Sequence, residues 1–286
     1  AVRRVAFLKT EYRDDATTLC HVGSGIKYIR FANLQKYDGI ITHSFSTRSG
    51  GASTGKYSSL NLNFRQGDRL ESVASNFRLL CSASGINPDN LVFSRQVHGS
   101  RVKAVDETDR EGIFPEEKEN DGFDALITDR RQTALVTFYA DCVPVLFFDP
   151  VKKAIGMAHS GWRGTLEQIA VKTVTAMNKK FKCSNSDIIA SVGPSIGKCC
   201  FEVGEDVYLS FRRSMEWSGR FCEHTEEGKW RIDLKSVVKR ALLDKGLREE
   251  NISVSSLCTK CRNDLFFSYR GDGGQTGCMA AVMQID

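Results

Sequence analysis

Three short apolar segments followed at once by an amphipathic one constrain the fold of this chain most. The segments "TALVTFY", "VLFFD" and "AIGMAHS" are separated by "ADCVP" and "PVKK", a pattern typical of buried strands joined by tight turns. The next residues, "TLEQIAVKTVTAMNKKF", place apolar side chains at helical spacing and lysines near the end, which predicts one helix from about Thr165. The centre of the fold is therefore built from strands that pack against a helix.

The same alternation continues on both sides of this centre. Upstream, "GDRLESVASNFRLLCSASGI" predicts a helix over about 68–84, begun by Asp68 and Glu71 in capping-box spacing, and "LVFSRQVHG" predicts a strand that ends at His98. Downstream, "IIASVG", "ISVSSL" and "MAAVMQI" predict strands, and "DLKSVVKRALLDKG" predicts a helix closed by Gly246. No linker divides the chain, so we expect a single α/β domain, a mixed β-sheet core flanked by helices.

Length, charge and cysteine content narrow the classes of protein. A chain of 286 residues can bury a substantial core, and its net charge of +5 is spread in short pairs, so we expect no nucleic-acid partner. No apolar stretch is long enough to span a bilayer and no signal peptide is present, so we expect a cytoplasmic protein, associated with an organelle only through partners. Ten irregularly spaced cysteines predict reduced thiols.

The expected organisation is one main domain with a short leading segment. We expect residues 41–286 to form the domain and residues 1–40 to be an N-terminal segment packed on it. The sequence begins with Ala1 rather than Met, so we expect a further N-terminal region to be missing from it. Protein partners of that full-length chain are then expected too.

Three residues form a candidate metal site. The chain has five histidines, and two of them, His98 and His159, lie at predicted strand ends beside glycines. Cys142 also lies at the end of a predicted strand. Two imidazoles and one thiolate would leave zinc a fourth position for water or substrate, which is typical of catalytic zinc. The three residues are far apart in the sequence and share no short ligand motif. By pattern alone, a structural role remains the more common one for such histidines.

Two glycine-containing segments are candidate anion sites. In "HSGWRG", Gly161 and Gly164 let the backbone approach a ligand just before a predicted helix N-terminus, where phosphate binds well. Arg163 either contacts that anion or pairs with a carboxylate on the surface. The segment "HSFSTRSGGASTGKYSSLNLNF" contains Arg48 and Asn63 and offers backbone donors for phosphate or the polar edge of a substrate. It lacks the P-loop spacing, so a flexible surface loop is the simpler interpretation.

The remaining cysteines of interest are interpreted as ordinary thiols. Cys258 and Cys261 form a single CxxC in "CTKC", with no second pair to complete a structural zinc site. Cys199 and Cys200 are adjacent, which suits a disulfide poorly, and we expect them to pack beside a glycine-shaped turn.

Five motifs in a fixed order carry a family resemblance. They are "RQVHGS", "ADCVPVLF", "AHSGWRG", "GPSIGKCCFEVG" and "LFFSYRGDGGQTGCMAA", and together they resemble the YfiH/YlmD family of multicopper polyphenol oxidase-like, or laccase-domain-containing, proteins. The resemblance runs from "ITHSFSTRSGG" to the C-terminus and looks closest to the vertebrate members. It implies a fold similar to the catalytic domain of cytotoxic necrotizing factor toxins. It also implies zinc bound by His98, Cys142 and His159, the same three residues that would carry catalysis.

The resemblance also implies an activity on purine nucleosides. The implied reactions are phosphorolysis of inosine, guanosine, adenosine and methylthioadenosine and deamination of adenosine, with nucleosides and phosphate as small-molecule partners. Two positions depart from the family pattern: Ser160 stands where alanine is usual, and Cys278 stands where arginine is frequent, which puts an anion contact from position 278 in doubt. Copper is a weaker alternative to zinc, because five histidines are too few for a trinuclear copper centre with its companion site.

Two other functions stay open at this point. Cys142 and His159 also suit a cysteine hydrolase that attacks an amide or ureido carbon, for instance that of citrulline. A non-catalytic interaction protein that retains an old site is the third alternative. Metal content distinguishes the zinc-dependent nucleoside enzyme from the cysteine hydrolase, because a thiolate bound to zinc is not free to attack carbon. A lack of turnover would favour the non-catalytic interaction protein.

Overall fold

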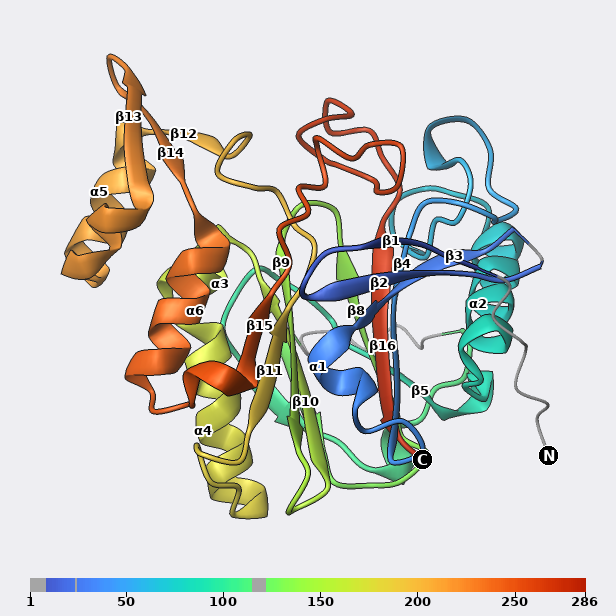
Figure 1. The fold of residues 1–286 in the computed structure, drawn as a ribbon. Coiled ribbons are helices and arrows are strands. Elements are labelled where there is room, and N and C mark those ends of the chain that lie inside the picture. The colour runs from blue at the N-terminus through green and yellow to red at the C-terminus, as the bar shows by residue number, and fades with distance from the viewer. Residues whose placement is uncertain (1–8, 24, 115–121) are drawn as a thin grey trace.

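Two mixed β-sheets pack face to face, and helices cover their outer faces (Figure 1). The computed structural model describes residues 9–23, 25–114 and 122–286. The predicted class, a single α/β domain of mixed β-structure flanked by helices, is confirmed. The strands divide over two large sheets, however, where the sequence pattern suggested one.

The larger sheet has seven strands and is antiparallel except for its last pair, β8 and β5, which is parallel. The first eight residues of the predicted N-terminal segment lie outside the described residues, and the rest of that segment supplies the first three strands. In spatial order the strands are β1 (Lys9–Arg13), β2 (Thr17–His21), β3 (Lys27–Phe31), β4 (Ile41–Ser46), β16 (Met279–Ile285), β8 (Ala134–Tyr139) and β5 (Leu91–Phe93).

The second sheet has six strands and carries most of the candidate site. Its outer pairs, β15 with β11 and β6 with β7, are parallel, and its central strands are antiparallel. In spatial order the strands are β15 (Ile252–Val254), β11 (Ile189–Val192), β9 (Val143–Asp149), β10 (Ala154–Ser160), β7 (Ala125–Thr128) and β6 (Val102–Ala104). A separate three-stranded sheet contains β12 (Glu202–Gly204), β14 (Lys229–Ile232) and β13 (Cys222–Glu226).

The core follows from the two-residue period of the strands. Along β8, Leu135 packs between the two sheets with Leu146 of β9, whereas its neighbour Val136 faces the opposite side. Helix α2 (Leu70–Ser84) covers that side with Phe77. Helices α4 (Ile169–Phe181) and α6 (Leu234–Asp244) cover the outer face of the six-stranded sheet. Full burial of each such side chain stabilises the fold by about 1.5–3 kcal/mol.

Short helices complete the chain. These α-helices are α1 (Ala32–Gln35), α3 (Trp162–Leu166), which lies between β10 and α4, and α5 (Glu205–Ser214), which packs beside the three-stranded sheet (Figure 1). Among the described residues, no helix is both long and apolar enough to cross a membrane. The 3-10 turns are η1 (Gly55–Tyr57), η2 (Pro88–Asn90), η3 (Glu107–Asp109), η4 (Glu216–Phe221) and η5 (Glu249–Asn251).

Two local predictions were wrong. Helix α2 begins at Leu70 with Arg69 as its N-cap and no side-chain cap, because the Asp68 carboxylate instead accepts hydrogen bonds from loop side chains, among them Ser53 Oγ at 2.6 Å. The single helix predicted from Thr165 is divided into α3 and α4. The division falls at Gln168, whose φ of 58° lies in the left-handed region that a right-handed helix cannot include.

Candidate functional site

The β9–β10 hairpin brings Cys142 and Gly161 to the same end of the six-stranded sheet. Ser160 pairs with Val143 and His159 pairs with Pro144 across this hairpin. Cys142 directly precedes β9, and Gly161 directly follows β10. The predicted strand ends are therefore neighbours in space, and the side chain of His159 lies beside them.

His98 reaches the same end of the sheet from a loop. The strand predicted to end at His98 stops at Phe93, and His98 itself has a φ of 58°. The Asp124 carboxylate shapes this loop, because it accepts hydrogen bonds from the backbone N–H groups of Val97 at 3.1 Å, His98 at 3.0 Å and Gly99 at 2.8 Å. One buried side chain therefore sets the position of His98.

Asp124, which directly precedes β7, also orients His159 on the adjacent strand β10. The His159 backbone N–H donates to the Asp124 carbonyl at 2.7 Å, and His159 Nδ1 lies 2.8 Å from Asp124 Oδ1. Burial opposes ionisation of Asp124, but the bonds from His159 and the loop amides hold the pKa of this carboxyl below its usual range. An ionised carboxylate can only accept, so His159 carries its proton on Nδ1 and its Nε2 is free to bind a ligand. The sequence analysis missed Asp124, although it stands directly before a buried strand.

The three predicted site residues are brought together. The ligand atoms of His98, Cys142 and His159 all lie within 4.8 Å of one another, and the two imidazole centroids are 4.8 Å apart. A Cβ on Gly161 would lie 3.0 Å from His98 Nδ1 and 3.2 Å from Cys142 Sγ, so a glycine keeps the space between them open. This group could hold a metal ion, and nitrogen and sulfur donors suit a transition metal.

The electrostatics of the group favour a thiolate. Burial raises the pKa of the Cys142 thiol, but the His159 and His98 imidazoles outweigh that effect and lower it to about 6. Burial likewise disfavours a charged His159, whereas the Cys142 thiolate and Asp124 raise the pKa of His159 to about 9. Without a metal ion, Cys142 and His159 therefore form an ion pair near neutral pH.

A cavity of about 800 Å³ opens over these three residues. Asn63 and Arg163 line it, and the Arg163 guanidinium lies 4.3 Å from the centre of the Trp162 ring. The structure does not bring Arg48 to this cavity lining, because its guanidinium donates to the Asn263 carbonyl at 3.0 Å and lies over Phe267. The other lining residues include Phe93, Gln96, Phe138, Tyr139, Phe201, Tyr269 and Arg270.

Asp141 is a second residue that the sequence analysis missed. It directly precedes Cys142 and has a φ of 86°. Its carboxylate accepts hydrogen bonds from the hydroxyls of Thr259 at 2.6 Å and Ser268 at 2.7 Å, and from the backbone N–H of Arg270 at 2.7 Å. Asp141 thereby ties residues 259–270, which contribute to the cavity wall, to the turn that carries Cys142.

The structure shows the contacts of Ser160 and Cys278, the two residues that depart from the family pattern. Ser160 Oγ lies 2.8 Å from Thr165 Oγ1, so the serine adds one buried hydrogen bond. Cys278 lines the cavity, Asn63 Nδ2 lies 3.5 Å from its sulfur, and burial raises the pKa of its thiol to about 11. A neutral thiol at position 278 offers no charge to an anion.

Comparisons with known proteins agree on one family. The purine nucleoside phosphorylase YlmD of Bacillus subtilis is 35% identical over 240 residues, which cover 84% of this chain and 86% of YlmD. An adenosine deaminase, RL5, from an unknown prokaryotic organism is 33% identical over 223 residues, which cover 77% of this chain and 85% of RL5. The crystal structure of the Bacillus licheniformis hypothetical protein YfiH superposes with a TM-score of 0.84 at 30% identity, covering 98% of this chain and all of YfiH.

The family model described as multi-copper polyphenol oxidoreductase laccase matches residues 42–286. This match covers the five ordered motifs, and the YlmD and YfiH similarities confirm the resemblance that those motifs carried. The fold and the convergence of His98, Cys142 and His159 are consistent with it. The chain belongs to the multi-copper polyphenol oxidoreductase laccase family, the family of YfiH and YlmD.

Proposed function

We propose that this protein is a zinc-associated enzyme of purine nucleosides. It cleaves inosine, guanosine, adenosine and methylthioadenosine with phosphate and deaminates adenosine. The observation that carries the proposal is the meeting of His98, Cys142 and His159 beneath a cavity of about 800 Å³. The names of the YlmD and RL5 relatives support the two reactions. A cavity of this size is within the range that binds small molecules.

The chain's own residues would hold the metal and keep its ligands in place. His98, Cys142 and His159 are a two-imidazole, one-thiolate set that suits zinc and leaves it a position for a further ligand. Asp124 fixes the protonated nitrogen of His159 and the backbone of the His98 loop, so the His159 ring and the position of His98 are set before metal or substrate binds. Zinc, when bound, would supply Lewis acidity at the base of the cavity.

Two exposed side chains at the cavity, Tyr269 and Arg163, suit the purine and phosphate groups of the proposed substrates. Tyr269 is 59% exposed and lines the cavity, so its ring is available to stack on a purine. Arg163 is exposed and, among the described residues, makes no ion pair, so it is the candidate phosphate contact. The helix N-terminus that the sequence suggested for phosphate is weaker support, since α3 has only five residues.

The two reactions need different partners in the same cavity. Phosphorolysis breaks the bond between ribose and purine while a phosphate oxygen bonds to the ribose carbon. Deamination adds the oxygen of water to the purine carbon that bears the amine and releases ammonia. Only phosphorolysis requires an anion site, so Arg163 should matter for phosphorolysis more than for deamination.

A cysteine hydrolase is the second candidate, favoured by the low pKa of Cys142. In metal-free protein the Cys142 thiolate and protonated His159 would form a nucleophile and acid pair suited to an amide or ureido carbon. A metal ion on Cys142 removes that nucleophile. The two candidates therefore make opposite predictions about metal.

One experiment tests both candidates. The metal-quantified protein is incubated with adenosine, inosine and citrulline, with and without phosphate, and products are identified by mass spectrometry. Nucleoside turnover that rises with zinc content and is lost in Cys142→Ser supports the proposal. Citrulline turnover that rises as metal is removed supports the hydrolase. If neither the zinc-loaded nor the metal-free protein converts any of these substrates, both candidates are contradicted.

A further inference from the structure

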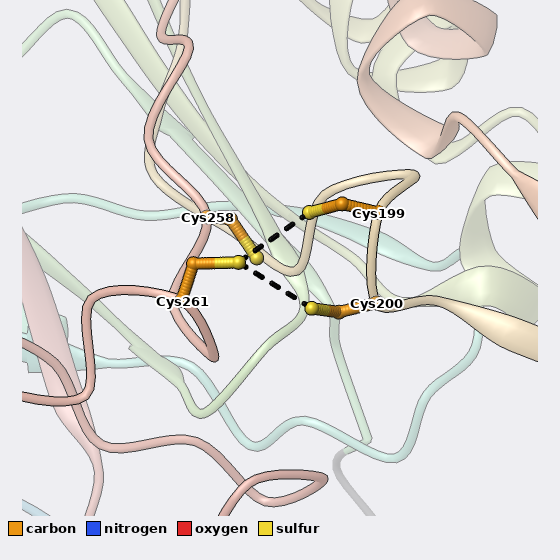
Figure 2. Close-up of side chains that lie close together, drawn as sticks. All are labelled: Cys199, Cys200, Cys258 and Cys261. Atoms are coloured by element: carbon orange, nitrogen blue, oxygen red, sulfur yellow. Dashed lines mark hydrogen bonds between the residues drawn. The ribbon is translucent and has the colours of Figure 1, made fainter.

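The ends of two parallel strands bring four cysteines together. Strands β11 and β15 are parallel neighbours in the six-stranded sheet, so the segments that follow them leave the same edge of the sheet. A bridge between Ser195 and Cys258 keeps these segments side by side. Figure 2 shows the result: Cys199 and Cys200 from one loop point toward Cys258 and Cys261 from the other.

The sulfur atoms are close enough together for a tetrahedral metal site. All four Sγ atoms lie within 4.8 Å of one another. Cys261 Sγ is 3.6 Å from Cys199 Sγ and 3.5 Å from Cys200 Sγ. Metal–sulfur bonds of about 2.3 Å in a tetrahedron place the sulfurs about 3.8 Å apart, whereas a disulfide joins them at about 2.05 Å. The arrangement is therefore close to the first geometry and far from the second.

The backbone around the cluster is shaped to admit the sulfurs. The Gly197 N–H donates to Cys258 Sγ at 3.2 Å, a bond that suits a thiolate ligand. A Cβ on Gly197 would lie 3.1 Å from Cys199 Sγ and 3.2 Å from Cys258 Cβ, so any larger residue would crowd the cluster. The sequence analysis found no second pair for the CxxC, and this was wrong, because that pair comes from a loop about 60 residues earlier in the chain.

We propose that Cys199, Cys200, Cys258 and Cys261 bind one zinc ion in a closed site of four thiolates, separate from the site at Cys142. Four sulfur ligands in tetrahedral positions select zinc or iron, and they leave no place for a substrate, which is typical of a structural site. An iron–sulfur cluster would need room for several metal and sulfide ions between the cysteines. Sulfurs this close together leave room for a single ion.

The proposed zinc would hold part of the cavity wall. Cys200 directly precedes Phe201, which lines the cavity. Thr259 lies between the two cysteines of the CxxC and donates to Asp141, the residue before Cys142. The ion would join the loops that carry these contacts and so connect a structural site to the position of Cys142. Its loss should loosen the cavity wall without removing any residue that touches substrate.

Metal content per chain tests the proposal directly. Protein is purified in reducing buffer and its zinc and iron are measured by mass spectrometry. The proteins are the wild type, Cys142→Ser, Cys261→Ser, Cys222→Ser, and Cys142→Ser combined with Cys261→Ser. Cys222 is a partly buried cysteine outside the cluster and serves as the matched control. Because Cys142→Ser removes only the other candidate site, the zinc that it retains reports on the cluster alone, whatever the protein's activity.

We expect Cys142→Ser and Cys222→Ser to retain the cluster zinc, about one ion per chain in Cys142→Ser, and Cys142→Ser combined with Cys261→Ser to retain none. Cobalt substituted into Cys142→Ser should give the intense sulfur-to-metal charge-transfer absorption of a tetrahedral thiolate site, and Cys199→Ser should reduce it. This spectrum is a second readout if the Cys261 variant folds poorly. Metal-free Cys142→Ser, iron in place of zinc, or two disulfides among the four cysteines under reducing conditions would overturn the proposal.

Discussion

Replacing Gly161 by alanine should impair the candidate site while leaving the backbone undisturbed. Gly161 has a φ of −65° and a ψ of 170°, an extended conformation that alanine adopts without strain. The added methyl group would meet His98 Nδ1 at 3.0 Å, Cys142 Sγ at 3.2 Å and His159 Cε1 at 3.6 Å. The change is therefore a steric probe of the three residues that we propose to bind zinc.

The expected size of the effect follows from these distances. Non-bonded heavy atoms pack favourably at about 3.5–4.0 Å, so His98 and Cys142 must each move by roughly 0.5 Å. A displacement of about 1 Å in a catalytic site costs about 100-fold in rate, so half of it should lower kcat/KM about 10-fold. Overpacking should also lower the free energy of unfolding by about 1–3 kcal/mol.

The control is an alanine of equal crowding elsewhere in the same strand pair. A Cβ on Gly156 would lie 3.0 Å from Met177 Sδ and 3.2 Å from Ile127 Cγ2, away from the site. Both variants are assayed for zinc content, nucleoside turnover and urea unfolding. We expect both to lose stability and only Gly161→Ala to lose zinc and kcat/KM. Normal turnover and zinc content in Gly161→Ala, or an equal loss in Gly156→Ala, would refute the steric argument.

Three further predictions concern single side chains. Asp124→Asn should lower metal affinity about 10–100-fold, because an amide cannot accept hydrogen bonds from all the N–H groups that bond to the carboxylate. The affinity is measured by competition with a chelator, and an unchanged value would exclude Asp124 as the residue that orients the ligands. Burial, assisted by Arg30, lowers the pKa of His43 to about 3, and His43 Nε2 accepts a hydrogen bond from the Phe31 N–H at 2.9 Å. Below pH 6.5 the imidazole of His43 therefore takes up a proton in the unfolded state but stays neutral in the folded state. Stability should thus fall as pH drops from 6.5 toward 3, by about 2 kcal/mol at pH 5 in urea unfolding, and His43→Gln should show a shallower dependence; equal slopes would contradict this. Arg163→Ala should weaken phosphorolysis of inosine far more than deamination of adenosine, and an equal loss of both with zinc retained would remove Arg163 as the phosphate contact.

The sequence alone determined the elements whose pattern is local. The strands β8, β9, β10, β11 and β16 match apolar runs that were visible in the sequence, because a strand buried on both faces needs continuous apolar residues whatever its partners are. Cys142 and His159 were placed correctly at strand ends for the same reason. The family, and through it the grouping of His98 with these two residues, followed from five ordered motifs rather than from any rule of spacing.

Only the tertiary structure decided which distant residues meet. The division into two sheets, the pairing of Asp124 with His159 and the clustering of four cysteines all depend on register between segments far apart in the chain. Arg48 shows the converse, since its loop pattern suggested a substrate contact and packing turned its guanidinium to Asn263. The periodic spacing of apolar residues shows which face of a segment is buried and which is exposed to water. It does not show which other segment packs against the buried face. That choice is made when strands pair and layers pack, where the free energy depends on both partners at once.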